Sequence, residues 1–283
     1  MGYKSFPVEE LIKITDLYSV FQEDFEQGYK FTGEMHNFWE CVYVVRGRVC
    51  VSADSRVCKL KAGEIIFHKP LEMHKFFIED AEGANLFIFS FSMESAISHK
   101  MADKIFALNS YQKNILHILM AYLKDECNNN QLDDMNCYQK GLVLLNNSPQ
   151  AIQMIASHIT HFLISISENE GLKSDSPDND ALLFKKAVDL LNEHITSSIT
   201  VNQLANKLNV SVSGIKRLFE KYAGISIHKY YLMLKMKVAT SMLQSGLRVN
   251  EVSDKLGFCS QAYFSSAYKR EMKINPSMIE KNL

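Results

Sequence analysis

The chain has 283 residues, of which 47% are hydrophobic and 22% are charged. This length suits two domains, and the composition is that of a globular protein and excludes wholesale disorder. Residues 181–283 contain 15 Lys and Arg against 7 Asp and Glu, a balance of +8, whereas residues 1–180 have a balance of −9. The asymmetry indicates a polyanionic partner for the C-terminal part, although uneven solvated faces are an alternative that charge alone leaves open.

The cysteines form neither a C-x-x-C pair nor a zinc-like pattern with histidines, so we expect them to be reduced, as in the cytosol. They are Cys41, Cys50, Cys58, Cys127, Cys137 and Cys259. The N-terminus has no recognisable targeting segment. The apolar stretches 86–93 and 152–166 are too short, or too interrupted by polar residues, to span a bilayer. The sequence therefore predicts a cytoplasmic protein without a membrane role.

The first third of the chain contains short aromatic and β-branched runs separated by turn residues. The expected strands are 38–45, 49–53, 64–68, 74–78 and 86–91. Strands of this length and spacing predict a β-sandwich or barrel.

The middle of the chain changes to helical spacing. Residues 105–122 and 149–166 place apolar side chains along one face, and Pro149 suits a first helical turn. These helices can cover the barrel or form a subunit contact, because periodicity does not distinguish a core face from a partner face. Residues 168–180 are rich in Glu, Ser, Asp, Asn, Gly and Pro and predict an exposed linker.

Beyond the linker the sequence predicts helices, beginning with 182–194. Thr200 and Gln203 then have the form of a capping box. A short helix at 203–208, a tight connection at 209–211 and a further helix follow. Ser211 is suited to cap that further helix.

The same pattern recurs about 48 residues later. Val252-Ser-Asp-Lys-Leu256 corresponds to Leu204-Ala-Asn-Lys-Leu208, and Gly257-Phe258 corresponds to Asn209-Val210. Residues 227–243 can form one long helix between the two units, with one apolar face. That face carries Tyr230, Leu234, Val238 and Met242.

Two short helices joined by a tight turn can place the second helix in the major groove of DNA. Two such units on one connecting helix can reach successive major-groove faces, roughly 34 Å apart. The residues expected in the core are Ile215, Leu218, Phe219, Tyr263, Phe264 and Tyr268. The basic residues expected to face outward and supply phosphate affinity are Lys216, Arg217, Lys221, Lys269 and Arg270.

Residues from about 199 to 278 resemble the paired helix-turn-helix domain of the AraC/XylS family of bacterial regulators. The matching stretches are Val-Ser-Gly-Ile-Lys-Arg-Leu-Phe at 212–219, Gly-Phe-Cys-Ser-Gln-Ala-Tyr-Phe-Ser at 257–265 and Ile274-Asn-Pro276. The resemblance implies DNA contacts from Ser213, Gly214, Lys216, Arg217, Gln261, Ala262, Ser265 and Ser266. Members often have Arg where Ser266 stands and Gly where Lys273 stands, and Lys269 and Arg270 could compensate for the missing Arg.

Residues 15–92 resemble a cupin barrel, through His36-Asn-Phe-Trp-Glu40, Gly47 and the segment from Gly63 to His74. In metal-dependent cupins the pattern implies a His-x-His start, a Glu and a later His. Glu34 stands where the first His would be. This departure favours a metal-free pocket, in which His36, Glu40 and His74 would hydrogen-bond a polar effector and Trp39 could stack on it, over a divalent ion bound by Glu34, His36, Glu40 and His74.

The sequence thus predicts an α+β protein that is not an enzyme and needs no cofactor. The expected parts are a cupin-like effector-sensing barrel at 1–95, a helical dimerisation segment at 96–167, the linker at 168–180 and a DNA-binding domain at 181–283. The expected partners are double-stranded DNA, a small effector such as a sugar, and a second copy of the chain. A metal-dependent cupin enzyme with a helical appendage, and a protein-interaction module, are the alternatives.

Overall fold

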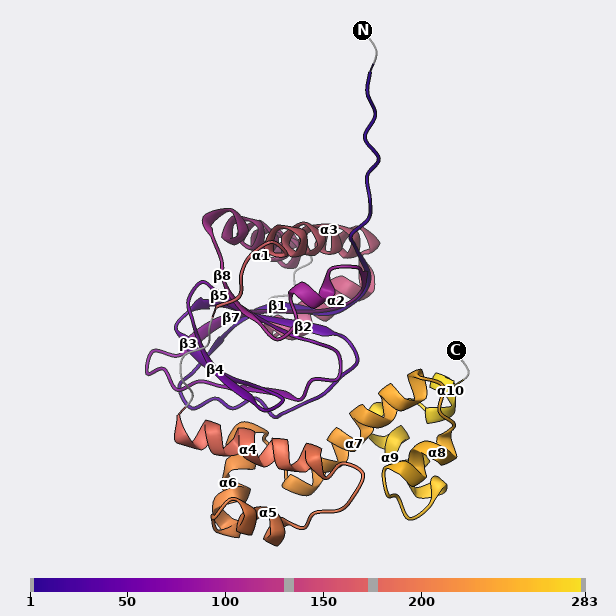
Figure 1. Ribbon diagram of the computed structural model, residues 1–283. Coiled ribbons are helices and arrows are strands. Elements are labelled where there is room, and N and C mark those ends of the chain that lie inside the picture. Colours follow the sequence, from indigo (N-terminus) through magenta and orange to yellow (C-terminus); the bar gives the residue numbers. More distant parts are fainter. Residues whose placement is uncertain (1–2, 130–134, 173–177, 281–283) are drawn as a thin grey trace.

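The computed structural model describes residues 3–129, 135–172 and 178–280. Within these ranges, strands, three α-helices and one short 3-10 helix (Ser98–Lys100) make up the N-terminal part, and helices alone make up the C-terminal part (Figure 1). The α+β fold expected from the sequence is confirmed.

The strands form two antiparallel sheets that face each other as an incompletely closed barrel. The larger sheet has the order β1-β7-β2-β5-β8 and the smaller β4-β3-β6. The strands are β1 (Ile12–Phe25), β2 (Trp39–Arg46), β3 (Arg48–Ala53), β4 (Arg56–Lys61), β5 (Glu64–His68), β6 (His74–Phe77), β7 (Ala84–Ser95) and β8 (Ile105–Ala107). Val42, Val51 and Ile88 belong to the apolar core between the sheets.

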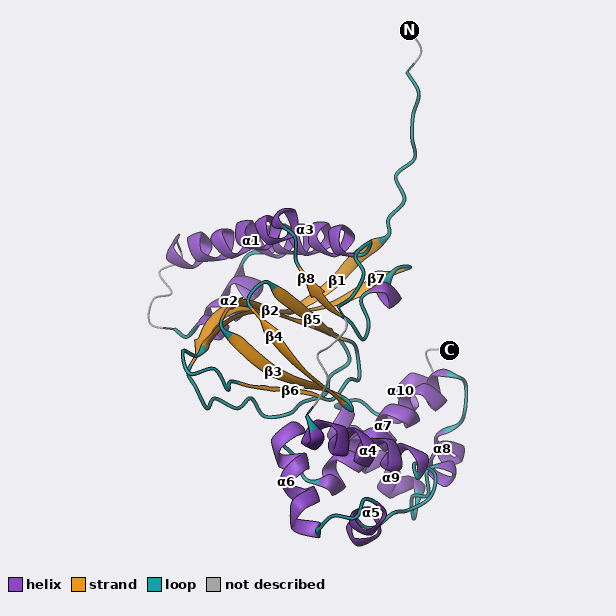
Figure 2. Ribbon diagram, turned by 60° about the vertical axis from the view of Figure 1, so that its left-hand side comes forward, coloured by secondary structure: helices purple, strands orange, loops and turns teal. Residues whose placement is uncertain are grey.

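Three helices cover the outer face of the larger sheet (Figure 2). They are α1 (Ser110–Asn129), α2 (Cys137–Asn147) and α3 (Pro149–Ile166). Side chains alternate between the two faces of a strand, so β2 directs Trp39, Cys41 and Tyr43 toward these helices and the residues between them toward the barrel interior. Both faces of β2 are therefore buried, which explains why its sequence is an almost continuous apolar run.

The C-terminal part consists of helices that lie on the opposite side of the barrel from α1 and α3 (Figures 1 and 2). They are α4 (Asn179–Glu193), α5 (Val201–Lys207), α6 (Val212–Tyr222), α7 (Ile227–Gln244), α8 (Val249–Lys255), α9 (Gln261–Met272) and α10 (Pro276–Glu280). One apolar cluster surrounds the first half of α7 and a second surrounds its later half.

The smaller sheet of the barrel packs directly on α4, α6 and α7. Cys50, Met73 and Phe77 share one buried cluster with these helices. The Lys75 ammonium donates a 2.8 Å hydrogen bond to the carbonyl O of Glu220, at the end of α6. The two parts of the chain thus share an apolar and hydrogen-bonded interface.

Two differences from the predicted elements have physical causes. Residues 105–107 were expected to begin a helix, but they pair with Glu64–Ile66 of β5, and α1 begins only at Ser110. Strand β1 was missed because register shifts near Ile14 and Leu17 interrupt its alternation of polar and apolar residues. Strand β4 and helix α2 were also missed. In contrast, α3 begins at Pro149 as predicted, with Ser148 as its N-cap.

Part of the expected linker, residues 173–177, lies outside the described residues, and Asp178 caps α4 with its side chain. All six cysteines are free thiols, as predicted. Within the described ranges, none of the helices has the length and apolar character needed to cross a bilayer.

Candidate DNA-binding surface and effector cavity

The first helix-turn-helix unit is formed by α5 and α6, whose caps lie where the sequence predicted them. The Thr200 amide donates to Gln203 Oε1 at 2.9 Å, and the Gln203 amide donates to Thr200 Oγ1 at 3.2 Å. Ser211 Oγ accepts a hydrogen bond from the Gly214 amide at 3.0 Å. Capping satisfies amides that have no partner within the helix, so these side chains fix where both helices begin.

The second unit, α8 and α9, has caps of the same kind. The carboxylate of Glu251 accepts a 2.8 Å hydrogen bond from the Arg248 amide, and Ser260 Oγ accepts one from the Tyr263 amide at 3.1 Å. The turns of the two units also correspond. Asn209 and Gly257 occupy the same place in the repeat, and both have left-handed backbones, with φ of +55° and +69°. Gly and Asn adopt this conformation most readily, so the turn geometry accounts for the two residue types.

Helix α7 joins the two units and contributes to both apolar clusters. Tyr230 and Leu234 face the first cluster, and Met236 and Leu243 face the second. On the predicted apolar face, Val238 and Met242 are only partly buried. Further contacts hold α9 and the end of α8 to α7. They are the hydrogen bond between the Thr240 and Tyr268 hydroxyls at 2.6 Å, the ion pair of Lys229 with Glu271, and the hydrogen bond from Lys235 Nζ to the Leu256 carbonyl at 2.7 Å.

The structure exposes most of the side chains that the sequence assigned to DNA. The exposed ones are Ser213, Lys216, Arg217, Gln261, Ala262, Ser266, Lys269 and Arg270, whereas Gly214 and Ser265 are partly buried. Of the predicted core side chains, five are buried, but Tyr263 is 46% exposed. That prediction is wrong because Tyr263 stands on the outer face of α9, beside Gln261 and Ala262.

Lys221 has a different place from the outward position that the sequence predicted. Its ammonium lies 3.4 Å from the carboxylate of Asp180 and 4.7 Å from the centre of the Tyr222 ring. The side chain is partly buried and ties the end of α6 to the start of α4. The contact of Lys221 with a DNA phosphate stays a prediction, since 36% of the side chain is exposed.

Beside this packed interface, a groove of about 700 Å³ lies between one face of α6 and the barrel. Arg217 and Glu220 line it from α6, and Tyr29, Lys30 and Glu79 line it from the barrel. The first recognition helix therefore has the barrel close beside the face that carries Arg217.

The barrel contains a larger cavity of about 800 Å³ beneath β1 and the segment that follows it. Its lining is aromatic and acidic. The lining residues include Tyr18, Phe21, Phe31, Phe38, Phe76, Glu23, Asp24, Glu34, His36, Glu40 and Ser90. Ser90 is placed by strand register: it lies opposite Ser19 of β1 and Glu40 of β2 and is hydrogen-bonded to both, at 2.7 and 3.0 Å.

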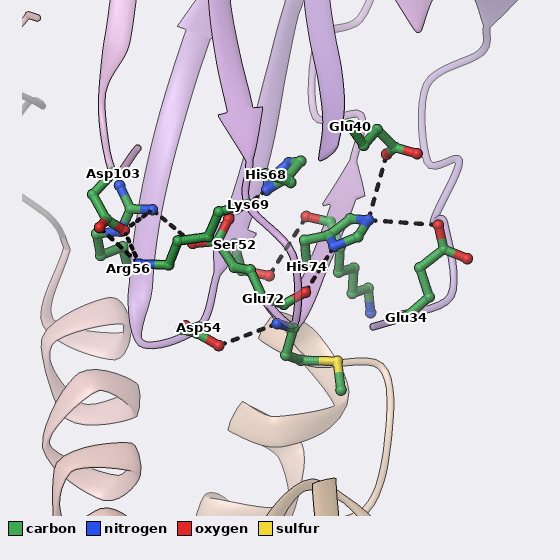
Figure 3. A network of polar contacts seen from close by, with 12 residues as sticks. Glu34, Glu40, Ser52, Asp54, Arg56, His68, Lys69, Glu72, His74 and Asp103 are labelled. Carbon is green, nitrogen blue, oxygen red and sulfur yellow. Dashed lines mark hydrogen bonds and ion pairs between the residues drawn. The ribbon is translucent and has the colours of Figure 1, made fainter. Parts of the chain in front are cut away.

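Four ionisable side chains, here called the Glu–His cluster, meet at the inner end of this cavity. They are Glu34, His36, Glu40 and His74, and one ligand-type atom from each lies within 4.8 Å of all the others. Figure 3 shows Glu34 and Glu40 converging on His74. The structure thus brings together the four residues that the cupin resemblance had singled out from distant parts of the sequence.

In the Glu–His cluster, the carboxylates and the imidazoles lie close enough to shift each other's pKa values. Burial alone would lower the pKa of His74, but the carboxylates of Glu34 and Glu40, at 3.5 and 3.4 Å, more than offset it and raise the pKa to about 10. Burial likewise opposes ionisation of Glu40, yet His36 and His74 hold its pKa well below the usual range. The buried pair of Glu40 and His74 therefore holds opposite charges, and each stabilises the charged form of the other.

A second polar network supports His74 from behind (Figure 3). The His68 ring stacks on that of His74 at 4.4 Å, and its Nδ1 lies 2.9 Å from the carboxylate of Glu72. Arg56 pairs with Glu72 at 2.9 Å and with Asp103 at 3.1 Å. His68 is thus a structural histidine, and it helps to fix the ring of His74.

Two family matches cover these two parts of the chain. Residues 17–175, more than half of the chain, match the AraC-like ligand binding domain. The chain belongs to the AraC-type family of transcription regulators. Residues 204–282 match a helix-turn-helix domain, so both parts of an AraC-type regulator are present. Members of this family regulate transcription and are not enzymes.

Curated relatives extend over most of this AraC-type chain. The Msm operon regulatory protein of Streptococcus mutans is 22% identical over 99% of this chain and 97% of its own length. The uncharacterised regulator YidL of Escherichia coli is 25% identical over 87% of this chain and 76% of its own length.

Solved structures of two bacterial proteins also align with the chain. ToxT from Vibrio cholerae matches at 13% identity over 96% of this chain and 98% of its own, with a TM-score of 0.39. The C-terminal domain of AraT from Geobacillus stearothermophilus matches at 26% identity over 36% of this chain and 85% of its own, with a TM-score of 0.34.

The cavity of this AraC-type chain differs from the sequence prediction in its aromatic residues. Trp39 is 8% exposed and belongs to the core beneath α1 and α3, so it does not line the cavity. His74 lies behind the lining, in contact with Glu34 and Glu40. Sequence reasoning missed Tyr18 and Phe38, whose rings stack at 3.9 Å beside the cavity. Phe38 could have been found from the sequence, because adjacent residues of an extended segment point to opposite faces and Phe38 precedes Trp39.

Proposed function

We propose that the protein is a sequence-specific DNA-binding regulator whose affinity for its operator responds to a small molecule in the barrel cavity. The observation that carries this proposal is the pair of capped helix-turn-helix units on one helix, α7, packed against a barrel that encloses a cavity. Because the partner would be chromosomal DNA, we place its activity in the cytoplasm.

In this proposal, α6 and α9 enter successive major grooves. Base contacts would come from their exposed N-terminal residues Ser213, Lys216, Arg217, Gln261, Ala262 and Ser266. Gly214 and Ser265 would lie near the DNA backbone. Lys269 and Arg270, in the last turn of α9, would contact phosphates and supply affinity without sequence preference. Gln261 is suited to adenine and Arg217 to guanine, through paired hydrogen bonds.

The test is binding of the full chain to operator DNA as a function of salt. We expect affinity to fall steeply with salt, because neutralised phosphates release counterions. Arg217→Ala should cost about 1–3 kcal/mol at the specific site. Lys185→Ala is the matched control, because Lys185 is an exposed cation on α4 that pairs with Asp189. Equal losses for both variants, or no duplex binding at low salt, would contradict the proposal.

The chemistry of the cavity supports a polyhydroxylated effector such as a sugar. Carboxylates of Glu34 and Glu40 and the Ser90 hydroxyl can hydrogen-bond hydroxyl groups, and the stacked rings of Tyr18 and Phe38 offer an apolar face. His36 completes the polar end, and His74 supports it from behind through Glu34 and Glu40. An effector of this kind changes DNA affinity only if it binds two states of the protein unequally.

A panel of sugars, tested by thermal shift and by DNA affinity, addresses the effector. A ligand should raise the melting temperature, and Tyr18→Ala should weaken its binding. Tyr3→Ala, at a fully exposed site away from the cavity, should leave ligand binding unchanged. A panel that changes neither melting temperature nor DNA affinity would argue against a sugar effector.

The dimer expected from the sequence would use the outer face of α1 and α3. Apolar side chains are exposed there, namely Tyr111, Ile118, Met154 and Ile164. Exposed apolar side chains on these two helices would become buried in a contact between subunits. Light scattering of the full chain tests it: Ile118→Asp should shift a dimer to a monomer, and a wild-type monomer at micromolar concentration would exclude this interface.

A further inference from the structure

The Glu–His cluster has the donor atoms and the arrangement of a metal site. We propose that it binds one divalent transition-metal ion of the zinc class. This goes beyond the proposed function, because the ion would bind whether or not the protein binds DNA or a sugar. The departure from the usual cupin pattern, Glu34 in place of a histidine, changes one donor from nitrogen to oxygen but does not remove it.

The first argument is the orientation of the two imidazoles. His36 Nδ1 lies 3.1 Å from the carbonyl O of Phe38, and His74 Nδ1 lies 3.0 Å from the carbonyl O of Glu72. A carbonyl can only accept a hydrogen bond, so both Nδ1 atoms have their proton. When an imidazole binds a metal ion it gives up its remaining proton, and with Nδ1 protonated the lone pair that binds the ion is on Nε2. This is the arrangement of metal-binding histidines, in which the second nitrogen donates to a backbone carbonyl or carboxylate.

The second argument is that both Nε2 atoms are buried and have no hydrogen-bond partner among the described residues. His74 is almost fully buried, and its Nε2 faces the two carboxylates (Figure 3). A buried polar atom without a partner is unfavourable and rare in folded proteins, unless an ion or water occupies the space in front of it. Two such atoms meet here, one from the loop before β2 and one from the first residue of β6.

The third argument is distance. His74 Nε2 lies 3.5 Å from Glu34 Oε1 and 3.4 Å from Glu40 Oε1, and His36 Nε2 lies 3.8 Å from an oxygen of each carboxylate. These separations are too long for good hydrogen bonds. For four donors at 2.0–2.2 Å around a tetrahedral ion, neighbouring donors are about 3.4 Å apart. The cluster is therefore close to the spacing that an ion would set.

The chemistry of the donors selects the ion. Two imidazole nitrogens and two carboxylate oxygens suit Zn²⁺ and its neighbours Co²⁺, Ni²⁺, Fe²⁺ and Mn²⁺. Ca²⁺ and Mg²⁺ prefer sites made of oxygen alone. The two carboxylates also match the charge of a divalent ion, so binding would neutralise a buried site. Glu34 is the most exposed member and lines the cavity, which gives the ion a way in.

The position of the cluster links it to the DNA-binding part. Glu34 and His74 exchange both backbone hydrogen bonds, each of 3.0 Å, so the segment with Glu34 is fixed to β6. The preceding residue, Gly33, packs against the carbonyl of Ala223, at the C-terminal end of α6. A metal ion held by Glu34 would therefore stiffen the segment that contacts the first recognition helix.

The test uses untagged full-length protein that has been treated with a chelator and dialysed. Titration with Co²⁺ should produce visible ligand-field absorption that saturates at one equivalent per chain, and Zn²⁺ should displace it. Zn²⁺ should also raise the melting temperature, because an ion that binds the folded chain alone stabilises it. Absence of both signals in the wild type would overturn the proposal.

Variants locate the ion. Glu34→Gln and His36→Gln should each weaken Co²⁺ binding at least tenfold, and Glu34 is exposed enough for its variant to fold normally. His99→Gln and Glu94→Gln alter exposed residues of the same types and should retain the wild-type affinity. Tyr18→Ala should lose the sugar effector but keep the ion, which separates the two proposals. Binding that survives both Glu34→Gln and His36→Gln would place the ion elsewhere and refute the assignment.

Discussion

The ammonium of Lys237, on α7, lies 2.6 Å from the carboxylate of Asp54, in the turn between β3 and β4 of the barrel. The pair joins the two parts of the chain across 183 positions of sequence, and both side chains are mostly buried. The same turn is fixed from within, since the Asp54 carboxylate also accepts a hydrogen bond from the Met73 amide at 3.1 Å (Figure 3).

A double-mutant cycle should measure this contact. Lys237→Met, Asp54→Asn and the double variant should give a coupling energy of about 1 kcal/mol, above the typical exposed pair because the environment is partly desolvated. The control cycle is Lys185 and Asp189, an exposed pair within α4, for which we expect about 0.3–0.5 kcal/mol. Chemical denaturation supplies the free energies. Equal coupling energies in both cycles would show that the Lys237–Asp54 pair stabilises the protein no more than an exposed ion pair does.

Gly33→Ala should separate the barrel from α6. A Cβ at Gly33 would lie 1.9 Å from the carbonyl O of Ala223, a backbone atom that cannot rotate away. The control is Gly28→Ala, since no atom lies within 4 Å of its Cβ and only its φ of +83° is strained, which costs about 1 kcal/mol.

Small-angle scattering distinguishes these two effects. Gly33→Ala should increase the radius of gyration, whereas Gly28→Ala should lower stability without expansion. An unchanged radius of gyration in Gly33→Ala would mean that the contact adjusts locally.

Lys273→Gly should stabilise the second helix-turn-helix unit. Lys273 ends α9 with a φ of +64°, in the left-handed region where a side chain is unfavourable. Glycine is also what members of the family often have there. Removing the side chain should add about 0.5–1 kcal/mol to the free energy of unfolding. The reciprocal change, Gly257→Ala at φ +69°, should cost about the same. A loss of stability in Lys273→Gly would show that the Lys273 side chain has a stabilising contact.

Glu271 should make the stability of the second unit depend on acid pH. Burial alone would raise the pKa of Glu271, but Lys229 and Arg270 more than offset it, so the pKa lies below its ordinary value of 4.5. An acid whose pKa is lowered by folding contributes stability above its unfolded pKa, and the contribution disappears as the pH falls through the folded pKa. Glu271→Gln should therefore cost about 1 kcal/mol at pH 7 and progressively less below pH 4.5.

Thermal melts across this pH range check the prediction for Glu271. Glu94→Gln, at an exposed pair with Lys13, should have little effect at any pH. A Glu271→Gln deficit that stays constant down to pH 3 would contradict the role given to the ion pair.

The sequence by itself determined the C-terminal helices, because their signals are local. Thr200, Ser211 and Ser260 cap helices through contacts within three residues, and the apolar spacing of α6 places Ile215 and Phe219 in the core. Repetition of one local pattern at two sites then predicted two units of the same kind. Local signals were also sufficient for α3, where Ser148 and Pro149 mark the start.

Only the tertiary structure decided the cavity and the contact between the two parts. Which face of β2 meets the helices depends on strand pairing, so Trp39 turned out to be core and Phe38 part of the cavity. Helical periodicity predicted a helix that includes residues 105–107, but in the structure this segment pairs with β5 and is a strand. The convergence of Glu34 with His74, and of Gly33 with Ala223, comes from residues far apart in the chain. Sequence patterns encode the period of an element, whereas these contacts depend on how elements pack together.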